Sequence, residues 1–321
     1  MLRSIRYRSR NPCPRARATT GEPYLERTGA GRQRSSVKRF GGDELMGEVP
    51  HGRVVVGMRI HPLTTGNVRA KQAFLFPSSG ARRQLDLFLP GPWSDPLPIH
   101  CWAVEHEDAL LMVDAGETAA VRNAPFARFE VSAEQELPAA LAGAGLSMDA
   151  VSEVVFTHHH GDHVNGLVHT GAPARISDLE LQFIATPVPR LMRRVLRQPL
   201  PATFAPRPLV LDGGPFGAFS RSCPLTRDGR IVAVATPGHT PGHVSVICID
   251  DGGRHVMLAG DATYTLEQLR SRRADAVAPD PKVQVATLDA ILTHCARHAT
   301  IYLPSHDPES AARLAGAITV S

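Results

Sequence analysis

The most informative stretch of this 321-residue sequence is Thr157-His158-His159-His160-Gly161-Asp162-His163. The run 152–157, with Val154-Val155-Phe156 at its centre, predicts a buried strand that leads directly into the histidine cluster. Zinc and similar cations favour imidazole and carboxylate ligands, and a catalytic site leaves one coordination position open. His158 and His160 are two residues apart and can point the same way, whereas Asp162 and His163 can face a second ion. The stretch therefore predicts a metal centre at the end of this strand.

Three more candidate ligands stand farther along the chain. His239, Asp261 and His306 each lie in a turn rich in Gly, Pro or Ser that directly follows a predicted strand. Ligand sites in layered α/β proteins form where loops leave the ends of strands, so we expect these turns to converge. The complete set of seven potential ligands, enough for two ions that share a carboxylate, is His158, His160, Asp162, His163, His239, Asp261 and His306.

The rest of the pattern alternates predicted strands with predicted helices. The expected strands lie at 101–105, 110–114, 152–157, 231–235, 244–249, 256–258 and 301–303, with a β-branched run at 54–58. The expected helices lie at 132–146 and 283–298. Residues 60–98 hold six prolines and are expected to be rich in loops. The segment 187–211 mixes arginines with apolar residues, and it either caps an apolar pocket or forms an ordinary amphipathic surface helix.

These motifs resemble those of the metallo-β-lactamase superfamily. The stretch 157–163 is similar to its H-x-H-x-D-H signature, and 236–243 is similar to the segment that carries its third histidine. The turn 114–116 resembles its early D-x-G turn, and the match runs in the right order over about residues 50–318. The resemblance implies an α/β hydrolase domain over residues 49–321. This domain would be a four-layer αββα sandwich with the site at one edge of its two sheets.

The resemblance also distributes the ligands between two divalent ions, which we expect to be zinc. The first ion would be bound by His158, His160 and His239. The second ion would be bound by Asp162, His163 and His306, and Asp261 would bridge both ions. His159 and His243 are not expected to be ligands, and His243 would hold its loop. Asp307 is interpreted either as an acceptor for a ligand imidazole or as a solvated turn residue.

The chemistry that the resemblance implies is hydrolysis. Two neighbouring divalent ions lower the pKa of a bridging water to about 7, which gives a metal-bridging hydroxide as the nucleophile. Asp162 would orient this nucleophile or move a proton to the leaving group. Tyr264 stands three residues after Asp261, which resembles the D-x-x-Y segment of N-acyl homoserine lactonases. There it would bind the substrate carbonyl, or else it packs at the start of a helix.

The leading expectation is therefore a metal-dependent hydrolase that opens a lactone, with N-acyl homoserine lactone as the best guess and quorum quenching as the consequence. An esterase, thioesterase or phosphotriesterase of the same superfamily would use the same residues. A non-catalytic metal-binding module is the alternative from another class, and the filled ligand positions argue against it. The expected partner is a small-molecule substrate, and a homodimer is consistent with the resemblance.

Basic charge is concentrated near the beginning of the sequence. Residues 1–42 hold 11 Lys and Arg against two Glu, whereas the remainder holds 24 basic and 29 acidic residues. We interpret residues 1–48 as a disordered Arg-rich extension or a misassigned start; a nucleic-acid arm and a transit peptide are the alternatives. The acidic remainder predicts no nucleic-acid partner, and the lack of an apolar run of about 20 residues predicts no membrane partner. Five cysteines without a C-x-x-C pair favour a reducing, cytoplasmic location.

Overall fold

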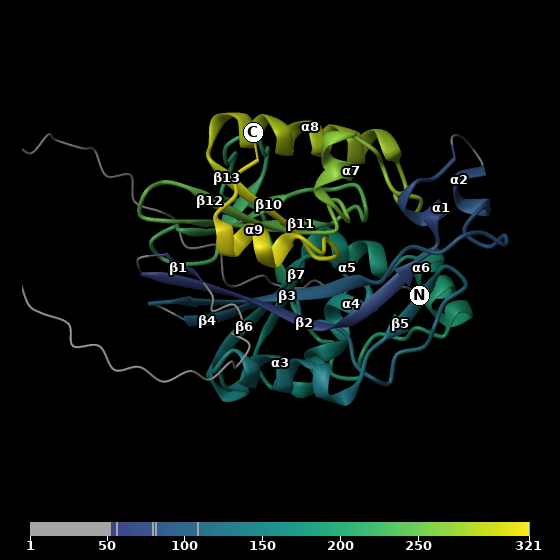
Figure 1. The fold of residues 1–321 in the computed structure, drawn as a ribbon, viewed down its shortest axis with the longest axis horizontal. Helices are drawn as coiled ribbons and strands as arrows, with labels where there is room; N and C mark the ends of the chain where they lie inside the picture. Colours follow the sequence, from purple (N-terminus) through teal and green to yellow (C-terminus); the bar gives the residue numbers. More distant parts are fainter. Residues whose placement is uncertain (1–52, 56, 79, 81, 108, 321) are drawn as a thin grey trace, which may run out of the picture.

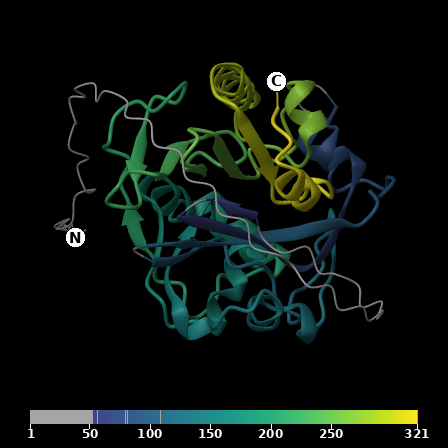
Figure 2. The ribbon, with the colours of Figure 1, turned by 60° about the vertical axis from the view of Figure 1, so that its left-hand side comes forward.

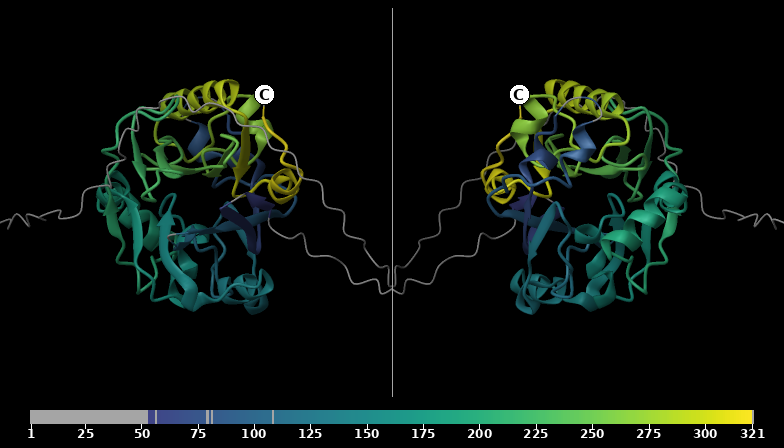
Figure 3. Two further views of the ribbon diagram at one scale, coloured as in Figure 1. Left: turned by 90° about the vertical axis from the view of Figure 1, so that its left-hand side faces the viewer. Right: turned by 90° about the vertical axis from the view of Figure 1, so that its right-hand side faces the viewer.

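The structure, a computed structural model, describes residues 53–320 apart from 56, 79, 81 and 108. Two β-sheets lie face to face, and helices cover the outer side of each sheet (Figure 1, Figure 3). This arrangement confirms the four-layer αββα sandwich that the sequence predicts. The Arg-rich extension over 1–48 lies outside the described residues and stays a prediction, as does the domain boundary at residue 49.

The first sheet has eight strands within the described residues. They are β1 (Arg53–Val55), β2 (Met58–Ala70), β3 (Leu97–His106), β4 (Ala109–Val113), β5 (Ala127–Glu130), β6 (Val151–Phe156), β7 (Ala174–Ser177) and β8 (Arg207–Leu209). Their order is β1-β2-β3-β4-β6-β7-β8, and β5 pairs with β2. Neighbours from β1 to β4 are antiparallel, and those from β4 to β8 are parallel.

The second sheet has five strands in the same part of the chain. They are β9 (Ser222–Pro224), β10 (Ile231–Ala235), β11 (Val244–Ile249), β12 (His255–Gly260) and β13 (Thr300–Pro304). Their order is β13-β12-β11-β10-β9, and only β12 and β13 run parallel. The parallel pair matters for the site, because it brings the ends of two strands to the same edge.

Nine α-helices connect and cover the sheets in the described residues. They are α1 (Gln72–Leu75), α2 (Arg82–Leu85), α3 (Leu137–Gly143), α4 (Gly161–Val164), α5 (Asp178–Ile184), α6 (Pro187–Leu196), α7 (Leu266–Arg270), α8 (Pro281–Arg297) and α9 (Ser310–Gly316). Short 3-10 turns lie at Ala133–Gln135, Met148–Ala150 and Asn165–His169. Figure 2 shows α8 almost end-on, above the second sheet. No helix in the described part of the chain is long and apolar enough to cross a membrane.

Successive side chains along a strand point to opposite faces of the sheet, so neighbouring residues belong to different apolar clusters. Trp102 of β3 belongs to the apolar core between the two sheets. Its neighbour Cys101 belongs instead to the outer cluster that Leu141 of α3 completes. On the other side of the molecule, Val234 of β10 and Leu288 of α8 share a third cluster. Each sheet therefore has one face in the central core and one face under helices.

The prediction that residues 60–98 form loops was wrong for their first part, because β2 runs through 58–70. Pro62 did not prevent this strand. It pairs with Trp102 on the β3 side, whereas β1 pairs only with residues 58–60 of β2 and β5 only with residues 67–70. Within the described residues, no strand pairs with the other edge of β2 at Pro62, and a sheet tolerates proline at such an open position.

One of the two predicted helices is confirmed, and the other is shorter than predicted. The helix expected over 283–298 is confirmed as α8, with Asp280 accepting a hydrogen bond from the backbone N–H of Lys282 at its start. The helix expected over 132–146 is shorter, because a 3-10 turn at Ala133–Gln135 precedes α3. The cysteines Cys101 and Cys248 are free and buried, and each belongs to an apolar core cluster.

Candidate metal centre

The seven predicted ligands come from four strand ends that meet at one edge of the sandwich. β6 leads into the histidine cluster and α4, while β10, β12 and β13 lead into the turns that carry the other ligands (Figure 1). One backbone hydrogen bond joins the two sheets here, from Val244 N to Thr157 O at 3.0 Å. Another, from Ser305 N to Gly260 O at 3.0 Å, joins the ends of β13 and β12. The expected convergence of the turns is confirmed.

A buried carboxylate holds the loop after β6. Asp114 has a positive φ of 62° and is 1% exposed, and its Oδ1 accepts a hydrogen bond of 2.8 Å from the Thr157 backbone N–H. Its Oδ2 accepts from Thr157 Oγ1 at 2.9 Å and lies 2.8 Å from His163 Nδ1. The same residue therefore fixes the start of the loop and the ring of one ligand.

Gly260 allows β12 to approach this loop closely. Its φ is 57°, and a methyl group in its place would lie 2.8 Å from Thr157 Cβ and Oγ1. Because only glycine tolerates both the left-handed backbone and this contact, the next residue, Asp261, reaches the histidine cluster.

Three imidazole nitrogens form the first candidate ion site. His160 Nδ1 lies 3.0 Å from His158 Nε2 and 2.8 Å from His239 Nε2. All three donor atoms lie within 4.8 Å of one another. A cation can satisfy three buried lone pairs that converge at this distance, so the donor set fits a zinc-like ion.

Asp162, His163 and His306 form the second candidate site, and their donor atoms also lie within 4.8 Å of one another. His306 Nε2 lies 3.5 Å from Asp162 Oδ2, and His163 Nε2 lies 3.9 Å from Asp162 Oδ1. The buried Nε2 of His163 has no hydrogen-bond partner among the described residues. A second cation would satisfy this nitrogen.

Asp261 lies between the two groups, as a shared ligand must. Its Oδ2 is 3.6 Å from His239 Nε2 and 3.9 Å from His158 Nε2 in the first site. Its Oδ1 is 3.4 Å from His163 Nε2 and 3.5 Å from His306 Nε2 in the second. This oxygen is buried and has no hydrogen-bond partner in the described part of the chain. The geometry is that expected of a bridging carboxylate.

Burial and neighbouring charges set the protonation of these groups. Burial, followed by the neighbouring histidines, lowers the pKa of His158 and of His160 well below the usual value. Burial also disfavours the charged form of His163, but Asp261 and Asp114 outweigh it and raise its pKa. Burial would raise the pKa of Asp261, yet His163 and His306 hold it well below its usual range. The centre thus offers neutral imidazoles at His158 and His160, an imidazole at His163 whose protonated form its carboxylate neighbours favour, and an ionised carboxylate at Asp261.

The two histidines predicted to be non-ligands have other partners. His159 Nδ1 is hydrogen-bonded to the buried carboxylate of Glu180, which also accepts from Thr240 Oγ1 and the Gly242 backbone. His243 Nδ1 lies 2.9 Å from Thr236 Oγ1, and its Nε2 accepts from the Asp261 backbone N–H at 3.2 Å. These contacts tie the turn after β10 to its neighbours, as predicted for His243.

Both interpretations of Asp307 were wrong. It is 3% exposed, so it is not a solvated turn residue. Its carboxylate accepts from the Leu266 backbone and forms an ion pair of 3.0 Å with Arg313, and neither partner is a ligand. The ring of the adjacent His306 instead donates from Nδ1 to the Pro98 carbonyl at 2.8 Å.

Sequence reasoning missed Asp275, which is fully buried beside the first site. Its Oδ2 accepts a hydrogen bond of 2.8 Å from His239 Nδ1 and one of 2.9 Å from Gln284 Nε2. It lies 36 positions from His239 in a loop without a recognisable motif, so no spacing pattern could have identified it. Such acceptors orient a ligand imidazole and increase its basicity.

Tyr264 faces the centre, as its place after Asp261 suggested. Its Oη lies 3.2 Å from His239 Nδ1, and the side chain is buried. Burial, followed by Asp275 and Asp261, raises the pKa of Tyr264 well above its usual value, so the phenol stays protonated. The phenol is thus a hydrogen-bond donor at the wall of a cavity.

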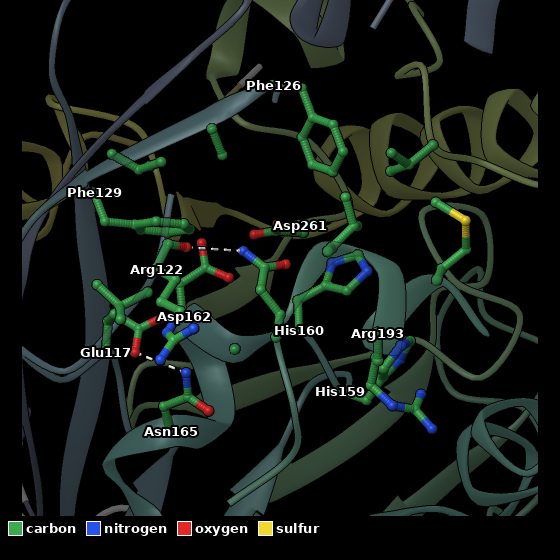
Figure 4. A pocket seen from close by; sticks show the side chains of 18 of the residues that line it. Glu117, Arg122, Phe126, Phe129, His159, His160, Asp162, Asn165, Arg193 and Asp261 are labelled. Carbon is green, nitrogen blue, oxygen red and sulfur yellow. Dashed lines mark hydrogen bonds between the residues drawn. The ribbon is translucent and has the colours of Figure 1, made fainter. Parts of the chain in front are cut away.

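A cavity of about 830 Å³ opens onto the centre. Asp162, Asp261 and Tyr264 line it at the metal side, and Glu117 and Asn165 stand beside Asp162 (Figure 4). Burial raises the pKa of Glu117 to about 8, and its Oε1 accepts from Asn165 Nδ2 at 2.8 Å. Sequence reasoning did not identify Glu117, because it has no place in the ligand spacing.

Most of the remaining cavity wall is apolar, with a few polar side chains such as Arg122 and Arg193 among the lining residues. The aromatic side chains in it are Phe74, Phe88, Phe126, Phe129 and Phe183. α6 contributes Val188, Met192 and Leu196, and Figure 4 shows Phe126, Phe129 and Arg193 on different sides of His160. The interpretation of 187–211 as a cap on an apolar pocket is supported, because α6 lines the cavity, whereas the exposed apolar side chains Val188 and Leu191 are not those of an ordinary amphipathic surface helix.

Known proteins similar in sequence to this chain include a lactonase and probable metallo-hydrolases. The family model described as the metallo-beta-lactamase superfamily matches residues 94–306. The N-acyl homoserine lactonase AttM of Rhizobium radiobacter is 27% identical over 83 residues, which cover 26% of this chain and 32% of that protein. A probable metallo-hydrolase of Mycobacterium tuberculosis is 29% identical over 184 residues, which cover 51% of this chain and 56% of that protein. The chain thus spans about a third to a half of the length of these relatives.

Solved structures share the fold at low sequence identity. An N-acyl homoserine lactone hydrolase with N-hexanoyl-L-homoserine bound at its metal centre superposes with a TM-score of 0.60 and 18% identity, covering 78% of this chain and 93% of that one. A probable metal-dependent hydrolase from Staphylococcus aureus reaches a TM-score of 0.63 at 18% identity, covering 79% and 91%. The match of the family model over residues 94–306 shows that the chain belongs to the metallo-β-lactamase superfamily, and the two-sheet fold and the converging donors agree with it.

Proposed function

We propose that this protein is a dinuclear-metal hydrolase that opens the ring of N-acyl homoserine lactones. One observation carries the proposal: seven converging donors and a protonated phenol lie at one side of a deep apolar cavity. A small polar ring would lie at the donors, and its acyl chain would occupy the Phe-lined remainder. The likeness to lactonases in sequence and fold supports this substrate class.

Two ions, which we propose to be zinc, would be bound by the two groups of donors and bridged by Asp261. When bound, they would supply Lewis acidity toward the lactone carbonyl and toward a water molecule. Tyr264 would donate a hydrogen bond to the carbonyl oxygen as negative charge develops on it. Asp162 would accept a proton from the attacking water and return it to the ring oxygen as the carbon–oxygen bond breaks.

The test combines metal content with turnover. We expect the purified protein to hold about two zinc-like ions and to open a long-chain acyl homoserine lactone faster than a short-chain one, measured by proton release. His160→Ala should lose metal and activity together. Tyr264→Phe should keep its metal and lose about 100-fold in kcat, the magnitude typical of one oxyanion donor. His169→Ala, outside the site, is the control.

The outcomes separate the alternatives. Two ions without lactone turnover would retain the metal centre and move the substrate to an open-chain ester, a thioester or a phosphotriester. Two ions without turnover of any of these would favour a non-catalytic metal-binding module. A protein that binds no metal after reconstitution would contradict the centre itself.

A further inference from the structure

The outer face of α6 combines a row of apolar side chains with a row of arginines, which a water-exposed helix does not usually carry side by side. Val188, Leu191 and Val195 recur three and four residues apart, so they share one face of the helix. They are 70%, 59% and 64% exposed. Arg190 and Arg194 are one turn apart on an adjacent face and are also exposed. We call these five residues the α6 stripe.

The helix is attached to the protein by its opposite side. Pro189 is buried, and Arg193 donates a hydrogen bond of 3.0 Å to the Ile184 carbonyl. Met192 and Leu196 line the cavity. The body of the protein therefore fixes the orientation of α6, and the α6 stripe points away from the core at the mouth of the cavity.

A second exposed apolar rim lies across the same mouth. Leu85 of α2 is 54% exposed, and Phe88 and Leu89 just after it are 48% and 45% exposed. Phe88 and Val188 line one cavity, so the two rims flank its opening. Figure 1 shows α1, α2 and α6 at the same end of the molecule. Exposed apolar side chains concentrated around one opening indicate a contact surface.

The charge of the α6 segment indicates what that surface contacts. Residues 181–211 contain five arginines and no acidic residue. Within the described residues, neither Arg190 nor Arg194 forms an ion pair. A two-fold contact between copies through the α6 stripe would bring these unneutralised arginines together. An anionic surface with an apolar interior complements both the arginines and the apolar side chains of the α6 stripe.

We propose that the α6 stripe and the opposite rim dock the mouth of the cavity onto a lipid bilayer that carries anionic headgroups. The apolar side chains would enter the interface, and the arginines would lie among the headgroups. Apolar ligands dissolved in the bilayer could then enter the cavity directly. No membrane partner was expected from the sequence, because it lacks an apolar run long enough to span a bilayer. A peripheral contact of this kind needs no spanning helix. It is independent of the proposed lactone chemistry.

Vesicle flotation of the full chain tests the proposal. The probes are vesicles of equal parts phosphatidylcholine and phosphatidylglycerol, compared with vesicles of phosphatidylcholine alone. We expect wild type to float with the anionic vesicles. Arg190→Gln/Arg194→Gln should bind about 25-fold more weakly, because each arginine near an anionic surface contributes about fivefold. Leu191→Ser/Val195→Ser should weaken binding at least about tenfold.

The control is Arg297→Gln/Ile318→Ser, which removes an exposed arginine and a 59% exposed isoleucine away from the cavity mouth. It should bind as wild type does, and all variants should keep the unfolding temperature of wild type. Every variant retains the basic residues 1–42. Equal binding by wild type and both α6 variants would therefore place the contact in that segment or elsewhere and overturn the proposal.

A depth measurement separates insertion from charge attraction alone. Tryptophan fluorescence of Val195→Trp should be quenched by brominated lipid, whereas that of Ile318→Trp should stay at the wild-type level. Absence of extra quenching in Val195→Trp would overturn the proposal. The proposal would also be overturned if wild type did not bind vesicles but self-associated, and if Leu191→Ser/Val195→Ser abolished that self-association. The surface would then join two copies of the chain.

Discussion

At the scale of single residues, ligand imidazoles are oriented by groups that do not themselves belong to the donor set. Asp114 accepts from Nδ1 of His163, and Asp275 accepts from Nδ1 of His239. Each contact fixes the tautomer, so that Nε2 presents its lone pair to the centre. The metal affinity of the site therefore depends on buried carboxylates as well as on the ligands.

This dependence predicts the effect of Asp275→Asn. The amide has the same shape but lacks the charge that polarises His239, so we expect zinc affinity to fall by about 10- to 100-fold. Competition with a chromophoric chelator measures this affinity. Asp250→Asn removes another well-buried carboxylate, which pairs with Arg254 in a hairpin far from the ligands. An equal loss of zinc affinity in both variants would show a general effect on folding rather than a role for Asp275.

The sequence predicts the ligands better than the residues that surround them, because the surrounding residues lie far from the ligand motifs along the chain. Four of the seven ligands lie within six residues, and the others stand directly after predicted strands. Asp275 and Glu117 reach the site only through the tertiary fold, so no local pattern marks them. Asp307 shows the opposite error, because it was expected to contact a ligand imidazole or solvent, whereas the fold pairs its buried carboxylate with Leu266 and Arg313.

At the scale of elements, the sequence predicts strands best where apolar residues run without interruption. β6, β10 and β11 appear as expected. β2 was missed because proline normally argues against a strand, and its open edge at Pro62 depends on where β1 and β5 end. Which strands leave an edge open is a property of the sheet. A single segment does not contain that information.

The close approach of β12 to the β6 loop makes Gly260→Ala a test of element packing. Alanine here must adopt a left-handed backbone and also displace Thr157, so we expect a loss of about 2 to 4 kcal/mol in stability and a loss of bound metal. Gly253→Ala is the matched control, because its φ is 74° but no atom lies within 4 Å of the new methyl. It should cost only about 1 kcal/mol and leave metal content unchanged. Chemical denaturation and elemental analysis give both values.

At the scale of the whole molecule, the sandwich places reactive and apolar surfaces next to each other. The donors lie at the edge of the two sheets, and α1, α2 and α6 extend the cavity away from them. The size and apolar wall of this cavity could not be predicted, because they depend on how three short helices pack around the opening. The cytoplasmic location and the homodimer stay predictions.

A histidine cluster on the far side of the second sheet predicts how the stability of the molecule varies with pH. His255 Nδ1 lies 2.8 Å from His294 Nε2, and the ring of His298 stacks on His255 at 4.6 Å. Burial, then the neighbouring histidines, lowers the pKa of His255 and of His294 to about 4. The unfolded chain therefore binds more protons than the folded protein between pH 6.5 and about 4.

Stability should consequently be greatest above pH 6.5 and fall as the pH decreases through this window. His294→Gln removes one of the two titrating rings, so its unfolding temperature should decrease less steeply between pH 6.5 and 4 than that of wild type. His169→Gln, outside the cluster, should follow the wild-type slope. Loss of metal at low pH is common to all three proteins and cancels in the comparison. Identical slopes for wild type and His294→Gln would mean that the cluster does not link protonation to folding.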